Sequence, residues 1–450
     1  MSFSATLLWQ GVKSQFARFL GINANSPIRL RLALGAWLIA FVSILGLLIF
    51  HPPYGVDLRV YGKTIAEVQS NASPYLSGIA RLEAGHAKGG FAFSFNYLYP
   101  PMTLPLLRVL GHLSRGLCAT VYLLLSFASF LTLLWIGLRC QENEESFTLP
   151  LIAPFAVFFP GLLCDDVWLH GNIVFLLYAL LFSAAYWGWK REQWRYFYGA
   201  LLIATYFKIP MLIFLAIPLL SAAGQLLPCI LTGSAVSAIY LSQRVLWPVA
   251  YQDYLRMMNL EFHYNGEFGF SPAGLLGKYL CYFNHPYLAL CTAFYLCYAT
   301  VIFLLLRRVS RAYRDGRISF AQWVPFLLTG VVLLYPRIKQ YDVAALTLPM
   351  AILFWRVLRE RIASRRKARF LAAGGFTACN IFVGVSTLYA LNNAVWEPVA
   401  MVVLVGLFLV SARSLYAQCG SVDQAVLLQE IQSPALHTLA MEYARSIEEA

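Results

Sequence analysis

Uncharged apolar runs as long as a membrane helix recur along this chain and constrain its fold more than any other feature. A helix needs about 20 apolar residues to cross a bilayer. Uncharged runs near this length occupy residues 32–50, 116–138, 171–189, 286–306 and 318–336. Only 12% of the residues are charged, whereas soluble domains carry about 25%. The sequence therefore predicts an all-α polytopic membrane protein.

Short segments rich in arginine set the predicted orientation in the membrane. The densest clusters lie at residues 307–317 and 356–369. The positive-inside rule places such segments in the cytoplasm. Alternating from a cytoplasmic Arg31 gives about 12 transmembrane helices, with both termini in the cytoplasm. The helices are expected near residues 32–50, 116–138, 147–164, 171–189, 196–207, 209–222, 226–242, 286–306, 318–336, 343–355, 370–391 and 398–412.

The same topology divides the chain into three parts. Residues 1–31 are expected to hold a cytoplasmic interfacial helix, since residues 5–20 place apolar side chains at helical spacing with basic ones among them. Residues 32–413 form the transmembrane domain, and residues 414–450 a cytoplasmic tail. The transmembrane domain includes a long first outer loop, residues 51–115, and a second outer loop, residues 243–285.

Some predicted spans are too short to cross a membrane. A helix over residues 196–207 would be about 18 Å long, against a hydrocarbon core of about 30 Å. The spans 209–222 and 343–355 have similar lengths. Charged groups at membrane depth are tolerated only where they face protein or water. We therefore expect Lys208 and Asp342 to lie around a cavity below the outer surface.

Charge distribution and cysteine spacing exclude several classes of ligand. The net charge is +13, but the basic residues follow short loops and form no stripe with interleaved aromatic residues. Nucleic acid is therefore not an expected partner, whereas membrane lipid is. The nine cysteines are scattered, and neither they nor the histidines have metal-ligand spacing. Neither a metal nor another cofactor is expected.

Acidic and basic side chains are predicted to meet at the outer membrane face. Asp57 is the first acid of the chain and follows the first span, while Lys208, Arg337 and Lys339 lie at the membrane edge. Sugar transfer from a lipid phosphate needs both kinds of group. A carboxylate takes the proton of the acceptor hydroxyl, and cations stabilise the departing phosphate. Lys208, Arg337 and Lys339 are therefore candidate ligands of a donor phosphate.

Each of these residues also has a structural interpretation. Asp57 can cap its loop or pair with Arg59. Lys208 can extend to the membrane surface. Arg337 and Lys339 can anchor the chain at the surface, with Asp342 as their partner. Further candidates for contacts with the sugar or the acceptor are Tyr61, Tyr97, Asp166, His170, His263, Asn265, Glu267 and Asp342.

Several motifs occur in an order that resembles a known family. The segment "DLRVYG" contains Asp57 and Tyr61, and "FNYLYPP" contains Tyr97. "HGNIVFLLYALL" carries Asn172 where the family usually has Gln, and "ATYFKIP" carries Lys208. Together these elements, within about residues 50–350, resemble glycosyltransferase family 87. That family comprises polyprenyl-phosphate-dependent membrane enzymes of the GT-C fold, typified by bacterial α-mannosyltransferases.

The resemblance implies a GT-C fold, an inverting single displacement and Asp57 as the general base. It also implies a polyprenyl-phosphate sugar donor, with mannose as the first candidate, and a glycolipid or glycan acceptor. Asn172 would contact the substrate, and no metal or nucleotide would be needed. The enzyme would lie in the inner (plasma) membrane with its active site facing the periplasm or the cell exterior. Departures from the family pattern in "YNGEFGFSPAGLLGKYL" and "YPRIKQYD" leave the donor sugar and the acceptor open.

Two other functions compete with this interpretation. A flippase or transporter of lipid-linked sugars would bind a similar phosphate without a base, and an internal repeat would be expected; none is visible in the sequence. An O-antigen ligase or polymerase also joins lipid-linked sugars. Such enzymes usually keep their key residues in a large loop late in the chain, whereas the first outer loop is the longest here.

Overall fold

The computed structural model describes most of the chain as helices. The described residues are 28, 31, 35, 38, 56–87, 96–140, 171–264, 269–282, 288–364, 366–368, 370–372, 374–375 and 393–431. All their regular elements are helical, and no strand occurs in them. The predicted all-α class is therefore confirmed for this part of the chain.

The helices follow one another with short connections. Their bounds are α3 (Val56–Gln69), α4 (Leu76–Ala87), η1 (Pro101–Thr103), α5 (Leu104–Leu110), α6 (Arg115–Arg139), α8 (Val174–Arg191), α9 (Arg195–Phe207), η3 (Ile209–Leu215), α10 (Ala216–Ser221), α11 (Leu226–Leu246), α12 (Pro248–Tyr264), α13 (Pro272–Tyr282), α14 (Leu288–Arg314), α15 (Phe320–Leu333), α16 (Gln340–Ala344), α17 (Thr347–Arg361) and α19 (Asn393–Ile431).

Several of these helices are suited to a membrane. Within the described residues, four helical segments are long and apolar enough to cross a membrane: Gly116–Gly137, Leu226–Leu246, Leu288–Arg314 and Glu397–Gln418. Their outward faces carry exposed large apolar side chains such as Leu231 of α11 and Leu296 of α14. Water would penalise such faces, whereas lipid tails would cover them without cost.

The predicted spans match the observed helices at many positions. Residues 196–207 correspond to α9, and residues 209–222 to η3 followed by α10, with the break at Lys208. The span predicted at 343–355 is wrong as a single element, because the end of α16 and the start of α17 divide it. The last helix continues past residue 413 to Ile431. Residues 1–27, 147–164 and most of 32–50 and 370–391 lie outside the described residues, so the number of about 12 helices stays a prediction.

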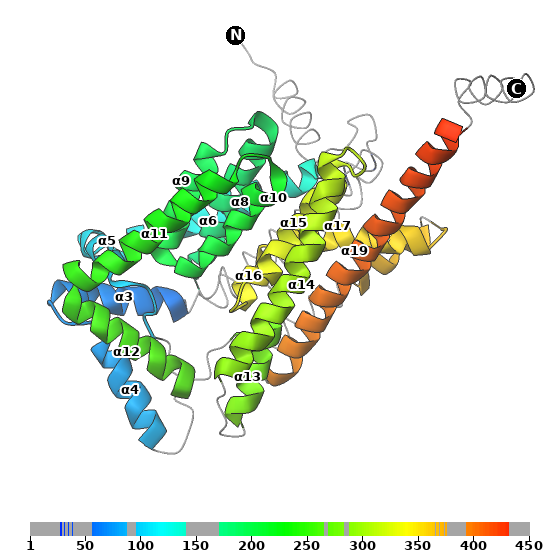
Figure 1. Cartoon of the computed structure of the whole chain (residues 1–450). Coiled ribbons are helices and arrows are strands. Elements are labelled where there is room, and N and C mark those ends of the chain that lie inside the picture. Colours follow the sequence, from blue (N-terminus) through cyan, green and yellow to red (C-terminus); the bar gives the residue numbers. More distant parts are fainter. Residues whose placement is uncertain are drawn as a thin grey trace, which may run out of the picture.

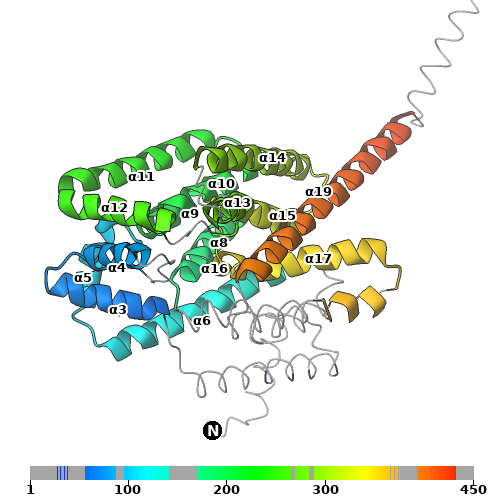
Figure 2. The same cartoon turned by 90° about the horizontal axis from the view of Figure 1, so that it is seen from below.

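The two predicted outer loops are themselves largely helical, which the sequence patterns do not predict. The first contains α3, α4, η1 and α5, and the second contains α12 and α13. We call α3, α4, α5 and α12 the loop helices. They lie together at the left of both views in Figures 1 and 2, and α4 packs along α12. A Cβ atom on Gly78 of α4 would lie only 2.8 Å from the Met257 side chain, so a small residue allows this close packing.

The described part of the chain has three apolar cores, of which one consists of Trp355, Ala368 and Ala372 and the other two matter for the site. The larger one joins α6, α8, α9, α15, α17 and α19 and includes the fully buried Trp323 and Phe326 of α15. The smaller one lies among the loop helices and contains Tyr75, Tyr97 and Met257. Short α16 lies in the middle of the molecule beside α8 (Figure 1). The candidate site is built where these two cores meet.

Candidate active site

Asp57 lies in the first turn of α3, and a buried amide fixes its carboxylate. The Nδ2 atom of Asn172 donates a hydrogen bond to Oδ2 of Asp57 over 2.7 Å. The Oδ1 atom of Asn172 accepts from the backbone N–H of Val174 over 2.9 Å, which fixes the orientation of the amide. The Tyr122 hydroxyl donates to the backbone carbonyl of Asn172. Asn172 therefore orients Asp57, whose own side chain is half-buried.

A glycine beside Asn172 allows α3 to approach this closely. Gly171 has a φ of +79°, in the left-handed region that favours glycine. A Cβ atom on Gly171 would lie 2.4 Å from Cγ of Leu58, the residue that follows Asp57. The backbone conformation and the contact with α3 therefore both require glycine at this position.

Replacing Gly171 by alanine is expected to separate α3 from Asn172. The strained φ and the clash with Leu58 should lower the free energy of unfolding by roughly 1–3 kcal/mol, and sugar transfer should fall because Asp57 loses its orienting amide. The measurements are the melting temperature in detergent and the initial rate of transfer. Gly199→Ala is the matched control, since a Cβ atom there meets nothing within 4 Å. Equal transfer by both variants would contradict the predicted role of Gly171.

Two tyrosine hydroxyls meet one helical turn beyond Asp57. The Tyr61 and Tyr99 hydroxyl oxygens lie 2.8 Å apart, and their ring centroids lie 5.8 Å apart. Burial raises the pKa of both hydroxyls, and the nearby Asp57 carboxylate raises them further. Both side chains therefore stay neutral. One hydroxyl donates to the other, and the second keeps its proton for a hydrogen bond to a sugar oxygen.

Lys208 occupies the break between two helices. Its backbone N–H makes the last helical bond, to the carbonyl of Ala204 over 2.9 Å, and Pro210 then directs the chain into η3. The Lys208 ammonium donates to the Tyr341 hydroxyl over 2.8 Å and lies 4.2 Å from the centroid of that ring. Burial lowers the pKa of Lys208 to about 8, while the negative charges of Asp342 and Asp57 oppose this shift.

Asp342 is completely buried, and both its carboxylate oxygens are bonded inside the protein. Oδ1 accepts from the Tyr178 hydroxyl over 2.8 Å, and Oδ2 accepts from the backbone N–H of Lys339 over 2.7 Å. Burial raises the pKa of Asp342, and the positive charge of Lys208 opposes this shift. These contacts favour a positioning role for Asp342 over direct contact with a substrate.

The turn that carries Arg337 and Lys339 is held by the segment before α13. The N–H of Phe270 donates to the carbonyl of Ile338 over 2.8 Å, and the Ser271 hydroxyl donates to the carbonyl of Pro336 over 2.5 Å. Both cationic side chains are partly exposed. Both positive charges lower the pKa of Lys208, and Lys339 directly precedes the short helix whose Tyr341 contacts that lysine.

The arrangement thus contains a carboxylate, two neutral hydroxyls and three cations. Comparison with known families shows to which family the chain belongs. The family model of Glycosyltransferase family 87 matches residues 97–336, more than half of the chain. The chain belongs to glycosyltransferase family 87. It is therefore a membrane glycosyltransferase, as the resemblance of its motifs predicted. No curated protein and no solved structure matches it significantly. The matched residues include Tyr99, Asn172 and Lys208 but not Asp57 or Asp342.

Other predicted site residues of the glycosyltransferase lie outside this arrangement or outside the described residues. Tyr97 is buried and its hydroxyl bonds that of Thr103 over 2.5 Å, so its geometry favours a packing role. Asp166, His170, Asn265 and Glu267 lie outside the described residues. His263 lies near the end of α12, and only its backbone is described. Substrate contacts by these residues stay predictions.

Tyr99, Tyr341 and Tyr178 are the candidate site residues that sequence reasoning missed. Tyr99 stands in the "YLYPP" motif, where the sequence analysis singles out Tyr97 instead. Tyr341 directly precedes Asp342, and only the fold shows that it meets Lys208. Tyr178 stands in an uncharged run where its hydroxyl gives no signal, because a tyrosine in such a run is normally a packing residue.

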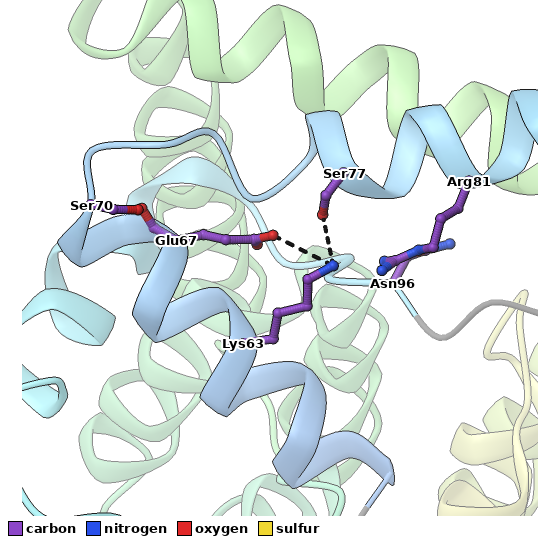
Figure 3. Close-up of polar contacts among 6 residues, drawn as sticks. All are labelled: Lys63, Glu67, Ser70, Ser77, Arg81 and Asn96. Carbon is purple, nitrogen blue, oxygen red and sulfur yellow. Dashed lines mark hydrogen bonds and ion pairs between the residues drawn. The ribbon is translucent and has the colours of Figure 1, made fainter.

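A polar network of the glycosyltransferase holds the segment that carries Tyr99 against the loop helices. Asn96 accepts from Arg81 of α4 over 2.9 Å and donates to the buried Glu261 of α12 over 3.1 Å. Figure 3 shows Arg81 with Asn96, and Lys63 of α3, which contacts Ser77 of α4 over 3.2 Å. These bonds join α3 to α4, and α4 and α12 to the segment that carries Tyr99.

Proposed function

We propose that this glycosyltransferase moves a sugar, mannose first among the candidates, from a polyprenyl-phosphate donor to a glycolipid or glycan acceptor with inversion. The observation that carries the proposal is the convergence of Asp57 and Lys208. Asp57 is oriented by Asn172 over 2.7 Å. Phe207, the residue before Lys208, packs on the same apolar core as Tyr61, one helical turn after Asp57, and the negative charge of Asp57 raises the pKa of Lys208. A carboxylate and a cation are the two groups that such a transfer requires.

The reaction is a single displacement. Asp57 accepts the proton of the acceptor hydroxyl as its oxygen forms a bond to the anomeric carbon of the sugar. The bond between that carbon and the phosphate oxygen breaks, and its electron pair leaves with the lipid phosphate. Lys208 stabilises the developing charge on that phosphate, together with Arg337 and Lys339. Attack opposite the leaving group inverts the anomeric configuration.

The neighbouring residues have supporting roles in this proposal. Asn172 holds Asp57 in place. Of the bonded hydroxyls of Tyr61 and Tyr99, one donates to the other and the second donates to the sugar. The GT-C fold and the location in the inner membrane belong to the same proposal. We also place the site on the periplasmic or outer side, since the cluster of arginines at residues 307–317 would then face the cytoplasm.

The competing functions predict different arrangements. A flippase or transporter would need no oriented base, whereas Asp57 is held by a buried amide with a fixed orientation. Membership of a glycosyltransferase family also favours a transferase over a transporter. An O-antigen ligase or polymerase is a transferase too, and it would transfer a glycan block instead of one sugar. The size of the transferred unit therefore distinguishes it from the proposed function.

The full-length protein in detergent or vesicles is expected to transfer radiolabelled mannose from polyprenyl-phosphate mannose to membrane lipids. GDP-mannose should give no transfer, because no nucleotide is needed to activate a sugar already linked to a lipid phosphate. The product should contain one added sugar of opposite anomeric configuration. Transfer from the nucleotide sugar alone would reject the proposed donor, and transfer of a block would favour the ligase or polymerase. Retention of configuration would reject the single displacement.

A further inference from the structure

Tyr178 is the point at which two elements of the donor side are held together. Its ring meets the ring of Phe214 in η3 edge-on, with centroids 5.4 Å apart. Its hydroxyl bonds Oδ1 of Asp342 in α16 over 2.8 Å. Tyr178 and Asp342 are both completely buried. One side chain of α8 therefore fixes the segment that follows Lys208 and the short helix that carries Tyr341.

Asp342 completes this connection from within α16. Its second oxygen accepts from the backbone N–H of Lys339, which closes the first turn of the helix. Helix α16 has only five residues, so it needs tertiary contacts to be stable. With Asp342 fixed at both oxygens, the adjacent Tyr341 is placed at the Lys208 ammonium.

We propose that Tyr178 and Asp342 are positioning residues that hold Lys208, through Tyr341, in the place where it binds the donor phosphate. This inference rests on the proposed function for its ligand, a lipid phosphate. It reassigns Asp342 from substrate contact to the support of a cation. It adds Tyr341 as the residue in direct contact with that cation. The side chains of Tyr178, Asp342 and Tyr341 thus set the position of the Lys208 ammonium.

The charges around Lys208 give the proposal a measurable consequence. Asp342 and Tyr341 approach from α16, Arg337 and Lys339 from the preceding turn, and Asp57 from α3. Among these, the negative charge of Asp342 has the largest effect on the pKa of Lys208 and raises it. Removing that charge should therefore leave Lys208 deprotonated at a lower pH.

The test begins with chemical labelling of Lys208 in the full-length protein, which needs no substrate. The rate of acylation of this amine, followed by mass spectrometry across the neutral and alkaline range, reports its pKa. Asp342→Asn should lower that pKa and make labelling roughly tenfold faster near neutral pH. Tyr341→Phe removes only the hydroxyl that accepts from the Lys208 ammonium, and it should also increase the labelling rate. Unchanged labelling in both variants would overturn the proposal, whether or not the protein transfers a sugar.

The second measurement separates positioning from a general structural role. The donor KM should rise roughly tenfold in each of three variants, Asp342→Asn, Tyr178→Phe and Tyr341→Phe, because each loses a hydrogen bond to a charged group. The acceptor KM should stay within twofold. Glu397→Gln is the matched control, since Glu397 of α19 is a buried acid paired with Lys278 of α13 instead. An equal rise in both KM values, or the same rise in the control, would overturn the proposal. Altered labelling without any transfer by the wild type would reject the donor and retain the positioning of Lys208.

Discussion

Replacing Asp57 by asparagine is expected to reduce sugar transfer by about 10²–10⁴-fold, the usual contribution of a positioned general base. Asparagine has the same shape, and its carbonyl oxygen can still accept the hydrogen bond that Asn172 donates to Asp57. It cannot accept the proton of the acceptor hydroxyl. The loss should therefore appear in kcat with little change in donor KM. Initial rates with varied donor and acceptor measure both quantities.

A matched acid distinguishes this effect from a general loss of charge. Asp253 of α12 accepts a hydrogen bond from Ser73 over 2.8 Å and lies among the loop helices. Asp253→Asn should retain transfer close to that of the wild type. Equal rates for wild type and Asp57→Asn would show that Asp57 only caps α3. The base would then have to be sought among Asp166 and Glu267.

Replacing Lys208 by alanine is expected to lower kcat/KM for the donor by about 10²–10³-fold, as for the loss of one donor to a developing oxyanion. The ammonium is partly buried beside Tyr341. Water that enters the space left by the side chain carries no positive charge to replace it. Lys208→Met retains much of the apolar stem and should be as inactive as the alanine variant. Lys63→Ala is the control, because that lysine is exposed and pairs with Glu67 of the same helix, α3. Donor kinetics that are unchanged in Lys208→Ala would remove this residue from the site.

The pH dependence of the wild type provides a second readout of Lys208. Its lowered pKa of about 8 means that the ammonium is charged below this pH and neutral above it. The kcat/KM for the donor, which reports the unliganded enzyme, should therefore decrease as pH rises above about 8. Lys208→Arg should abolish this decrease, since arginine stays protonated throughout the range. A decrease that persists in the arginine variant would assign the titration to another group.

The family is recognisable from the amino-acid sequence because its signals are local along the chain. The uncharged runs predict many of the helices, and the short runs on either side of Lys208 predict the break between α9 and η3. The family motifs have fixed positions along the chain, and they contain Asp57, Tyr61, Asn172 and Lys208. These motifs do not state which residues touch one another.

The loop helices escape prediction because their sequence gives weak signals. Segments such as Val56–Gln69 and Pro248–Tyr264 mix polar and apolar side chains, unlike the uniform runs of a membrane span. Their stability comes from packing, as in the contact of Gly78 with Met257. The wrong span at 343–355 has a related cause. The buried Asp342 closes the first turn of a separate short helix, α16, which ends within the predicted span.

The sequence alone determined the all-α membrane class, the family and the position of most helices, because apolar length and motif order are properties of one-dimensional patterns. Only the tertiary structure decided which groups form the site. It brought Asn172 to Asp57 across 115 positions, and Tyr341 to Lys208 across 133 positions. Hydrogen bonds of this kind depend on the docking of helices that are distant in sequence. The partners in these hydrogen bonds are therefore determined only by how the apolar faces of the helices pack.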